Sequence, residues 1–153
     1  MRALPPIFAT LLVLATTHAQ SQERQWNFDQ TDSEAYLLFG VPETDDVGVS
    51  FWCELQSGAI KFYVPQTDPK LKLAEVVPLD VDVGSKLYRF IGRSSISETD
   101  GKASIEAEIK ATDPIFADFK EANKFSVKAG SKSHIFPLNE VDFTGLLSVC
   151  RKP

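Results

Sequence analysis

Few residues of this chain have side chains that could act as nucleophiles, general bases or metal ligands. The 153 residues include two cysteines, Cys53 and Cys150, and two histidines, of which only His134 lies beyond the first twenty residues. A cysteine nucleophile needs a positioned base, and neither cysteine lies in a known catalytic motif. Cysteines of exported proteins usually pair. The sequence therefore predicts a disulfide between Cys53 and Cys150.

His134 precedes Ile135 and Phe136 in a strand-like run, where a lone histidine is usually a structural or surface residue. A catalytic triad would also need a nucleophile and an orienting acid around this base. A zinc site would need three or four protein ligands. No motif in the sequence supplies them, and we predict no catalytic residue, no metal site and no cofactor.

Acidic residues in three connecting segments offer a different chemistry. The segments contain Asp29/Asp32/Glu34, Glu43/Asp45/Asp46 and Glu98/Asp100. Two carboxyl groups about 5 to 10 Å apart can hydrolyse glycosidic bonds, and oxygen ligands can bind calcium. None of the segments has the spacing of a calcium-binding loop, and solvated loop charge is the commoner use of such residues. A small hydrolase that uses these carboxylates is the enzymatic alternative.

Residues 47–64 form the clearest strand-turn-strand pattern of the chain. Apolar residues alternate with polar ones on both sides of the turn-forming residues 56–58, which is typical of a β-hairpin with one buried face. If Phe51 and Cys53 face the core, Trp52, Lys61 and Tyr63 share the opposite face. Because aromatic residues are enriched at binding hot spots, these three residues are the candidate binding surface.

The alternative for this face is that a helix covers it as a second core layer, which is the commoner use of a helix beside a sheet. The sequence contains one clear helix signal for this role. Asp113 and Pro114 have the types preferred at a helix cap and at the first helical position. Apolar residues then recur at helical spacing, which predicts a helix over residues 114–123.

The remaining patterns predict strands. Alternation or apolar runs occur at residues 26–28, 34–41, 71–83 with a bend near 75–78, 86–92 and 105–110, and a final hairpin spans 125–138. Asp100-Gly101 is a hairpin-turn signal before the strand at 105–110. The tail from Asn139 is predicted to be a helix capped by Asn139, although Gly145 is a poor helix residue and favours a terminal strand.

Together these elements predict a mainly β fold. We expect an antiparallel β-sandwich or open barrel of about eight strands, with one or two short helices and one disulfide. Closing the Cys53–Cys150 loop would restrict the unfolded chain by about 4 to 5 kcal/mol.

Residues 1–19 have the features of a secretory signal peptide. Arg2 is an early cation, an apolar run covers residues 7–15, and small residues at Thr17 and Ala19 suit cleavage after Ala19. The apolar run is too short for a membrane-spanning helix of about 20 residues. We therefore expect residues 20–153 to form a single domain, exported to the periplasm or the extracellular space, without stable membrane insertion.

The charge of the chain limits its partners. The full chain has a net charge of −5. Cleavage would remove Arg2 and leave about 15 basic against 21 acidic residues. An acidic chain without a basic cluster is a poor candidate for nucleic-acid binding, which requires Lys and Arg at the phosphates. Negative charge favours solubility or a cationic partner.

The order of elements resembles that of small exported β-proteins of Gram-negative bacteria, such as the invasion-associated locus B family. The resemblance rests on a signal peptide, Trp26, a strand ending in Phe51-Trp52-Cys53, Phe136-Pro137-Leu138, and a close at residues 146–150. It implies an envelope-accessory or binding protein without a catalytic motif. The expected function is non-catalytic recognition of a protein or envelope component, and an inhibitor or immunity protein against a cationic enzyme is the third alternative.

Overall fold

The structure is a computed structural model. It describes residues 23–65, 67, 70–97 and 101–153. The predicted signal peptide lies outside the described residues, and so do Glu98 and Asp100. Within the described part of the chain, no helix is long and apolar enough to span a membrane.

The described residues form one antiparallel sheet and two short helices. The strands are β1 (Gln25–Gln30), β2 (Glu34–Gly40), β3 (Val47–Glu54), β4 (Ala59–Val64), β5 (Val76–Val83), β6 (Lys86–Ile96), β7 (Ala103–Lys110), β8 (Lys124–Ala129) and β9 (Lys132–Pro137). The helices are α1 (Ile115–Glu121) and α2 (Phe143–Cys150). The strand order in the sheet is β1-β2-β3-β4-β7-β6-β5-β8-β9. The prediction of a mainly β fold with one or two helices is confirmed, with nine strands in the sheet instead of about eight.

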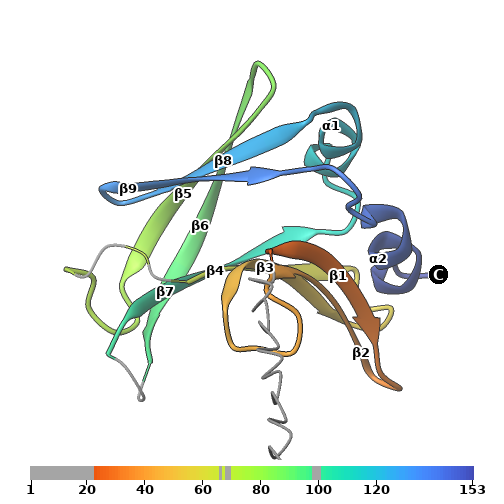
Figure 1. Cartoon of the computed structure of the whole chain (residues 1–153), viewed down its shortest axis with the longest axis horizontal. Helices are drawn as coiled ribbons and strands as arrows, with labels where there is room; N and C mark the ends of the chain where they lie inside the picture. Colours follow the sequence, from red (N-terminus) through yellow and green to blue (C-terminus); the bar gives the residue numbers. More distant parts are fainter. Residues whose placement is uncertain (1–22, 66, 68–69, 98–100) are drawn as a thin grey trace, which may run out of the picture.

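The sheet curls into a half-barrel, so the open barrel and not the two-sheet sandwich is the arrangement found. In Figure 1, β1 to β4 and β7 run below, β6 and β5 rise steeply, and β8 and β9 return above them. The two helices lie at the open end of the curl, α1 beside the end of β8 and α2 between the upper and the lower strands. The sheet thus wraps its apolar face inward and leaves its other face outside.

Strand β6 forms the corner of this curl. Its first half pairs only with β5 and its last residues only with β7, while Gly92 and Arg93 pair with both. A Cβ atom at Gly92 would lie 2.4 Å from Ile105 Cγ2 and 3.0 Å from the Glu106 carbonyl oxygen. Glycine is therefore needed where the two neighbouring strands diverge.

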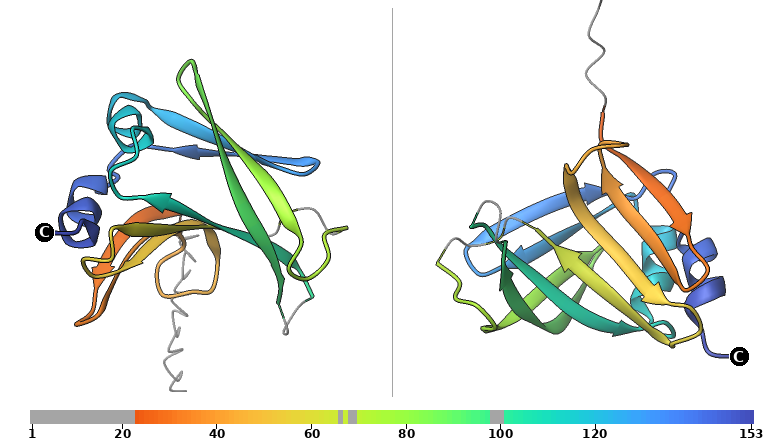
Figure 2. Two further views of the ribbon diagram at one scale, coloured as in Figure 1. Left: turned by 180° about the vertical axis from the view of Figure 1, so that it is seen from behind. Right: turned by 90° about the horizontal axis from the view of Figure 1, so that it is seen from below.

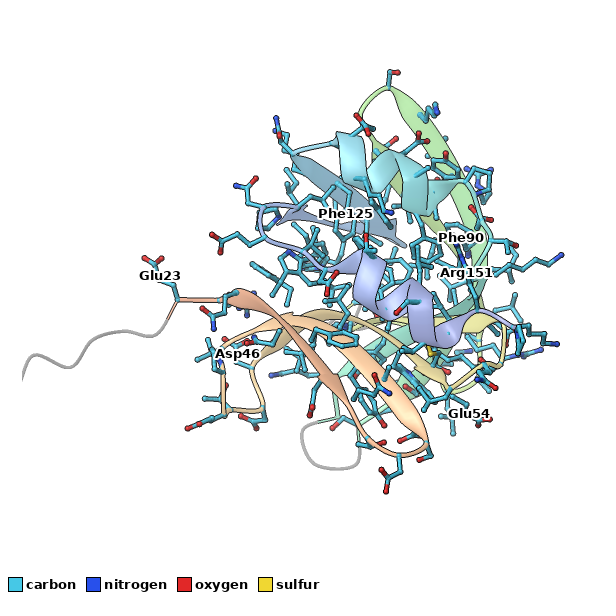
Figure 3. The ribbon with its side chains drawn as sticks, turned by 90° about the vertical axis from the view of Figure 1, so that its right-hand side faces the viewer. Glu23, Asp46, Glu54, Phe90, Phe125 and Arg151 are labelled. Carbon is cyan, nitrogen blue, oxygen red and sulfur yellow. A yellow bond between two sulfur atoms is a disulfide. The ribbon has the colours of Figure 1, made fainter. Side chains whose placement is uncertain are left out.

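The core is centred on phenylalanine rings from four strands, β3, β4, β8 and β9, and from both helices. The fully buried ring of Phe51 stacks on Phe62 of the adjacent strand with centroids 4.6 Å apart. It also contacts Phe143 of α2 at 5.1 Å and Phe119 of α1 at 5.9 Å. Figure 3 shows side chains filling the space between the helices and the sheet, with Phe125 among them. Both helices therefore pack on the face of β3 that carries Phe51.

The two edge strands meet at one end of the half-barrel. Trp26 of β1 donates a hydrogen bond from Nε1 to the Pro137 carbonyl oxygen of β9, at 2.7 Å. Phe39 of β2 packs edge-on against Phe136, with centroids 6.0 Å apart. Side-chain contacts thus connect the β1 and β9 ends of the sheet, which no backbone hydrogen-bond ladder joins.

The predicted disulfide is present and attaches α2 to β3. Cys53 and Cys150 are bonded with their Cα atoms 5.8 Å apart, across 97 residues. The last turn of α2 is also tied to the β3–β4 turn, because Gln56 and Gly58 donate backbone hydrogen bonds to the carbonyl oxygens of Val149 and Cys150. These bonds satisfy carbonyl groups that a helix end leaves without partners.

The tail is helical as predicted, but its cap is Asp142 and not Asn139. The Asp142 side chain accepts a hydrogen bond from Gly145 N at 2.7 Å. A Cβ atom at Gly145 would lie 2.3 Å from the Asp142 carboxylate. Gly145, which counted against a helix in the sequence, is thus the residue that leaves room for the cap.

Other predicted boundaries also differ from the observed ones. Residues 71–75 form no strand, and Leu73 is 71% exposed, because the chain turns here before β5 begins at Val76. Pro78 lies inside β5 without breaking it, since β5 pairs only with β6 at that position and β8 joins from Leu79 onward. Helix α1 ends at Glu121, two residues early, because Ala122 is already extended.

A polar contact anchors α1 to the β5–β6 hairpin. Asp118 accepts hydrogen bonds from Lys86 Nζ, at 2.7 Å, and from the Tyr88 hydroxyl. The hydrogen bond from Lys86, followed by that from Tyr88, lowers the pKa of Asp118. The same contact with Asp118 raises the pKa of Tyr88 to about 12.

Replacing both cysteines, Cys53→Ala with Cys150→Ala, should lower the free energy of unfolding by about 4 kcal/mol, because the unfolded chain regains the entropy of an open loop. Urea denaturation measures the change. Reductant should bring the wild type to the level of the variant and leave the variant unchanged. Equal stability of the wild type and the variant in the absence of reductant would contradict the prediction.

Asp118→Asn should destabilise the protein at pH 7, and the deficit should shrink in acid. The folded pKa of Asp118 lies below its unfolded value of 3.8, so its contribution is complete above that value and is lost as the pH falls through the folded pKa. Urea denaturation at pH 7, 5 and 3 measures the difference from wild type. Asp32→Asn, in an exposed loop, is the control. If Asp118→Asn lowers the free energy of unfolding by the same amount at all three pH values, the ionised carboxylate of Asp118 is not the stabilising group.

Candidate functional site

The three residues of the candidate surface lie together on the outer face of the sheet. Trp52 pairs with Lys61 across β3 and β4, and Tyr63 lies opposite Ser50. All three are partly exposed, while Phe51 and Phe62 between them are fully buried. The three side chains therefore share the face opposite Phe51, as the alternation of residues 47–64 predicts.

Neither of the two described helices covers this face. Phe116 and Phe119 of α1 contact Phe51 on the inner face, and so does Phe143 of α2. Seen from below in the right-hand view of Figure 2, the lower strands lie in front of both helices. The expectation that the helix near Pro114 forms a second layer over Trp52 is wrong, because the curl of the sheet provides an inner face that both helices fill.

The structure adds a third aromatic residue to the surface. Tyr36 of β2 lies opposite Trp52 in register, and the two rings stack with centroids 6.1 Å apart and planes 19° apart. The Tyr36 hydroxyl donates a hydrogen bond to Glu34, and this bond raises the pKa of Tyr36. We call Tyr36, Trp52, Lys61, Tyr63 and Glu106 together the outer aromatic face.

Strand β7 contributes the acidic side of this surface. Trp52 donates from Nε1 to Glu106 Oε2 at 3.3 Å. Lys61 Nζ forms a salt bridge with Glu108 Oε2 at 3.0 Å. This hydrogen bond from Lys61 to Glu108 raises the pKa of Lys61, and the charges of Glu106 and Glu54 add to the rise. Lys61 therefore lies in a negative local field.

A shallow depression of about 460 Å³ adjoins the outer aromatic face, where β4, β7 and β6 run side by side. Its lining includes Lys61, Tyr63, Ile91, Arg93, Glu106 and Glu108. Arg93 lies opposite Glu106 in register, and its side chain forms no salt bridge with any of the described residues. We call this hollow the β4–β7–β6 depression.

Sequence reasoning missed Tyr36, Ile91, Arg93 and the two glutamates of this site. The alternation in residues 104–110 does place Glu106 and Glu108 on the exposed face of their strand. Nothing local indicates that β7 pairs with β4, since Val64 and its partner Ile105 are 41 positions apart in the sequence. The site is assembled by long-range strand pairing, which periodicity does not reveal.

The two acidic segments of the enzymatic alternative that the structure describes lie apart from each other. The β1–β2 and β2–β3 connections, which carry Asp32 and Asp45, lie at opposite ends of the seven-residue strand β2, about 20 Å apart. Asp46 is engaged with Arg24 in a salt bridge of 2.5 Å. Among the described residues, no group of three His, Cys, Asp or Glu side chains is placed to hold a metal ion.

His134 lies on β9, far from the outer aromatic face in the strand order. Its ring stacks on Phe136 with centroids 6.2 Å apart. Its Nε2 atom is buried and has no hydrogen-bond partner within the described part of the chain. His134 thus shares the inner face of the edge strand β9 with the buried Phe136.

Two neighbouring residues of β4 should differ sharply in their effect on stability. Lys61→Ala should cost less than about 1 kcal/mol, because the Lys61 and Glu108 side chains are 36% and 60% exposed. Phe62→Ala should cost about 3 to 5 kcal/mol, because it empties a buried ring site. Urea denaturation measures both, and a loss above about 2 kcal/mol for Lys61→Ala would show that the outer face is structural.

Comparison with known proteins finds no match. No family model fits the sequence, and no curated protein and no solved structure is significantly similar to it. The resemblance to the invasion-associated locus B family stays a prediction.

Proposed function

We propose that the chain is an exported, non-catalytic binding protein that recognises a protein or another envelope component through its outer aromatic face. The observation that carries this proposal is that aromatic rings occupy a sheet face that no other described element covers. Aromatic side chains supply large contact areas, and they dominate the energy of many interfaces.

The rigidity of the face supports the proposal. Trp52 is held by the stack with Tyr36 and by its hydrogen bond to Glu106. Both partners lie on strands of the same sheet, so little conformational freedom remains for the indole ring to lose. Preorganised side chains lower the entropic cost of association.

The disulfide supports the expectation of export. A bond between Cys53 and Cys150 is stable in the periplasm or outside the cell and would be reduced in most cytosols. The net charge of −5 fits a cationic partner. An inhibitor or immunity protein that binds a cationic enzyme is the narrower form of this proposal.

Affinity capture from the envelope fraction of the native host tests the proposal. The oxidised mature protein is the bait, and Trp52→Ala with Tyr63→Ala should reduce the captured partner more than about tenfold, because buried aromatic hot spots contribute about 2 kcal/mol or more each. Quantitative mass spectrometry measures the recovery.

The matched control removes apolar area from another part of the sheet. Leu87→Ala with Ile135→Ala changes two residues that are 58% and 67% exposed on β6 and β9, and it should leave capture unchanged. A partner that is retained by the Trp52 and Tyr63 variant, or lost equally with the control, would rule out the outer aromatic face as the binding surface.

A further inference from the structure

The depression itself is lined by two carboxylates and two cations, namely Glu106 and Glu108 with Lys61 and Arg93, but the sheet face beside it is acidic. On the outer face of β1 to β4 and β7, the register places five acidic residues and two basic ones, namely Asp29, Glu34, Glu54, Glu106 and Glu108 against Lys61 and Lys110. Strand β6 adds Arg89 and Arg93 to this face, and Arg89 is paired with Asp80 of β5. The surface beside the depression therefore attracts positive charge.

Two carboxylates in the depression are available to a ligand. Glu106 accepts a hydrogen bond from the neutral indole of Trp52, which fixes its position without cancelling its charge. Glu108 is paired with Lys61, but both side chains are substantially exposed. Such a pair contributes little and is readily exchanged for another cation. Carboxylates also retain lone pairs for further donors.

Apolar side chains border the same depression on its other side. Ile91 of β6 lines it and is 63% exposed. Its cross-strand neighbour on β5 is the exposed Pro78, and Val76 on the same face is 55% exposed. From β3 to β5 this surface crosses four strand spacings, about 19 Å, which an extended segment of about six residues would span.

We infer that the β4–β7–β6 depression binds an extended segment of a partner protein that carries a Lys or Arg side chain beside an apolar one. The cation lies on Tyr63 and donates to Glu106 and Glu108, while the apolar side chain packs on Ile91. Arg93 selects against a second basic residue next to the first. This inference rests on the proposed function and specifies the chemistry of its partner.

A capped hexapeptide, Ser-Leu-Ser-Arg-Ser-Leu, is the probe, because an extended chain then presents Arg and Leu on one face. Titration into the ¹⁵N-labelled, oxidised protein should shift the amide resonances of β4, β7 and β6. Peptides with Glu in place of Arg, or with Ser in place of Leu, should bind at least fivefold more weakly.

Glu106→Gln with Glu108→Gln should weaken binding of the Arg peptide about fivefold or more. Glu23→Gln with Glu121→Gln is the matched control, because it removes the same charge from exposed acids elsewhere and should leave the affinity unchanged. The amide spectrum of each variant reports whether it is folded.

Three outcomes would overturn the inference: no shifts on these strands, equal or tighter binding of the Glu peptide, or the same loss in both pairs of glutamine variants. The capture experiment separates the two proposals. A partner that is lost with Trp52→Ala and Tyr63→Ala but retained with Glu106→Gln and Glu108→Gln leaves the proposed function standing and refutes the basic segment.

Discussion

Burial of one apolar sheet face is the constraint on which this structure depends. A nine-stranded sheet with alternating side chains must hide its apolar face from water, and here it does so by curling around the ring of Phe51. The curl leaves an opening at one end, which α1 and α2 fill with Phe119 and Phe143. The disulfide holds α2 in that position through Cys53, which lies two residues from Phe51 on the same face.

The properties of the outer surface follow from this burial. Because both helices pack against Phe51 on the inner face, neither covers Trp52 and its neighbours on the opposite face. Period-two alternation makes each buried residue of β3 and β4 the direct neighbour of an exposed one. The same strands thus supply the packed core and a rigid outer face, so a rearrangement of the core would also displace Trp52 and Lys61.

Much of the fold could be predicted from local patterns. The hairpin of residues 47–64, the strand at 105–110, the final hairpin and both helices were predicted from alternation, turn residues and cap residues. Errors arose where a tertiary contact overrides a local signal. Leu71 and Leu73 have the spacing of a strand, yet the chain turns there, and Pro78 is accepted inside β5 because no second strand pairs with it. Gly145 has a low helix propensity, but only glycine leaves room for the Asp142 carboxylate that caps the helix.

The candidate site was predicted only in part, because most of its residues are brought together by tertiary contacts. Trp52, Lys61 and Tyr63 belong to one hairpin, and their common face follows from the side-chain period and a short turn. Tyr36, Glu106, Arg93 and Ile91 join them through pairings of β2, β7 and β6.

The sequence by itself determined the strand periods, the pairing of the two cysteines and the acidic character of the chain, because these depend on residue types, their number and short spacings. Only the tertiary structure decided the strand order, the face that the helices cover and the charges beside Trp52. Those features depend on contacts between residues that are distant in the sequence, and a local sequence pattern does not reveal which distant residues pair.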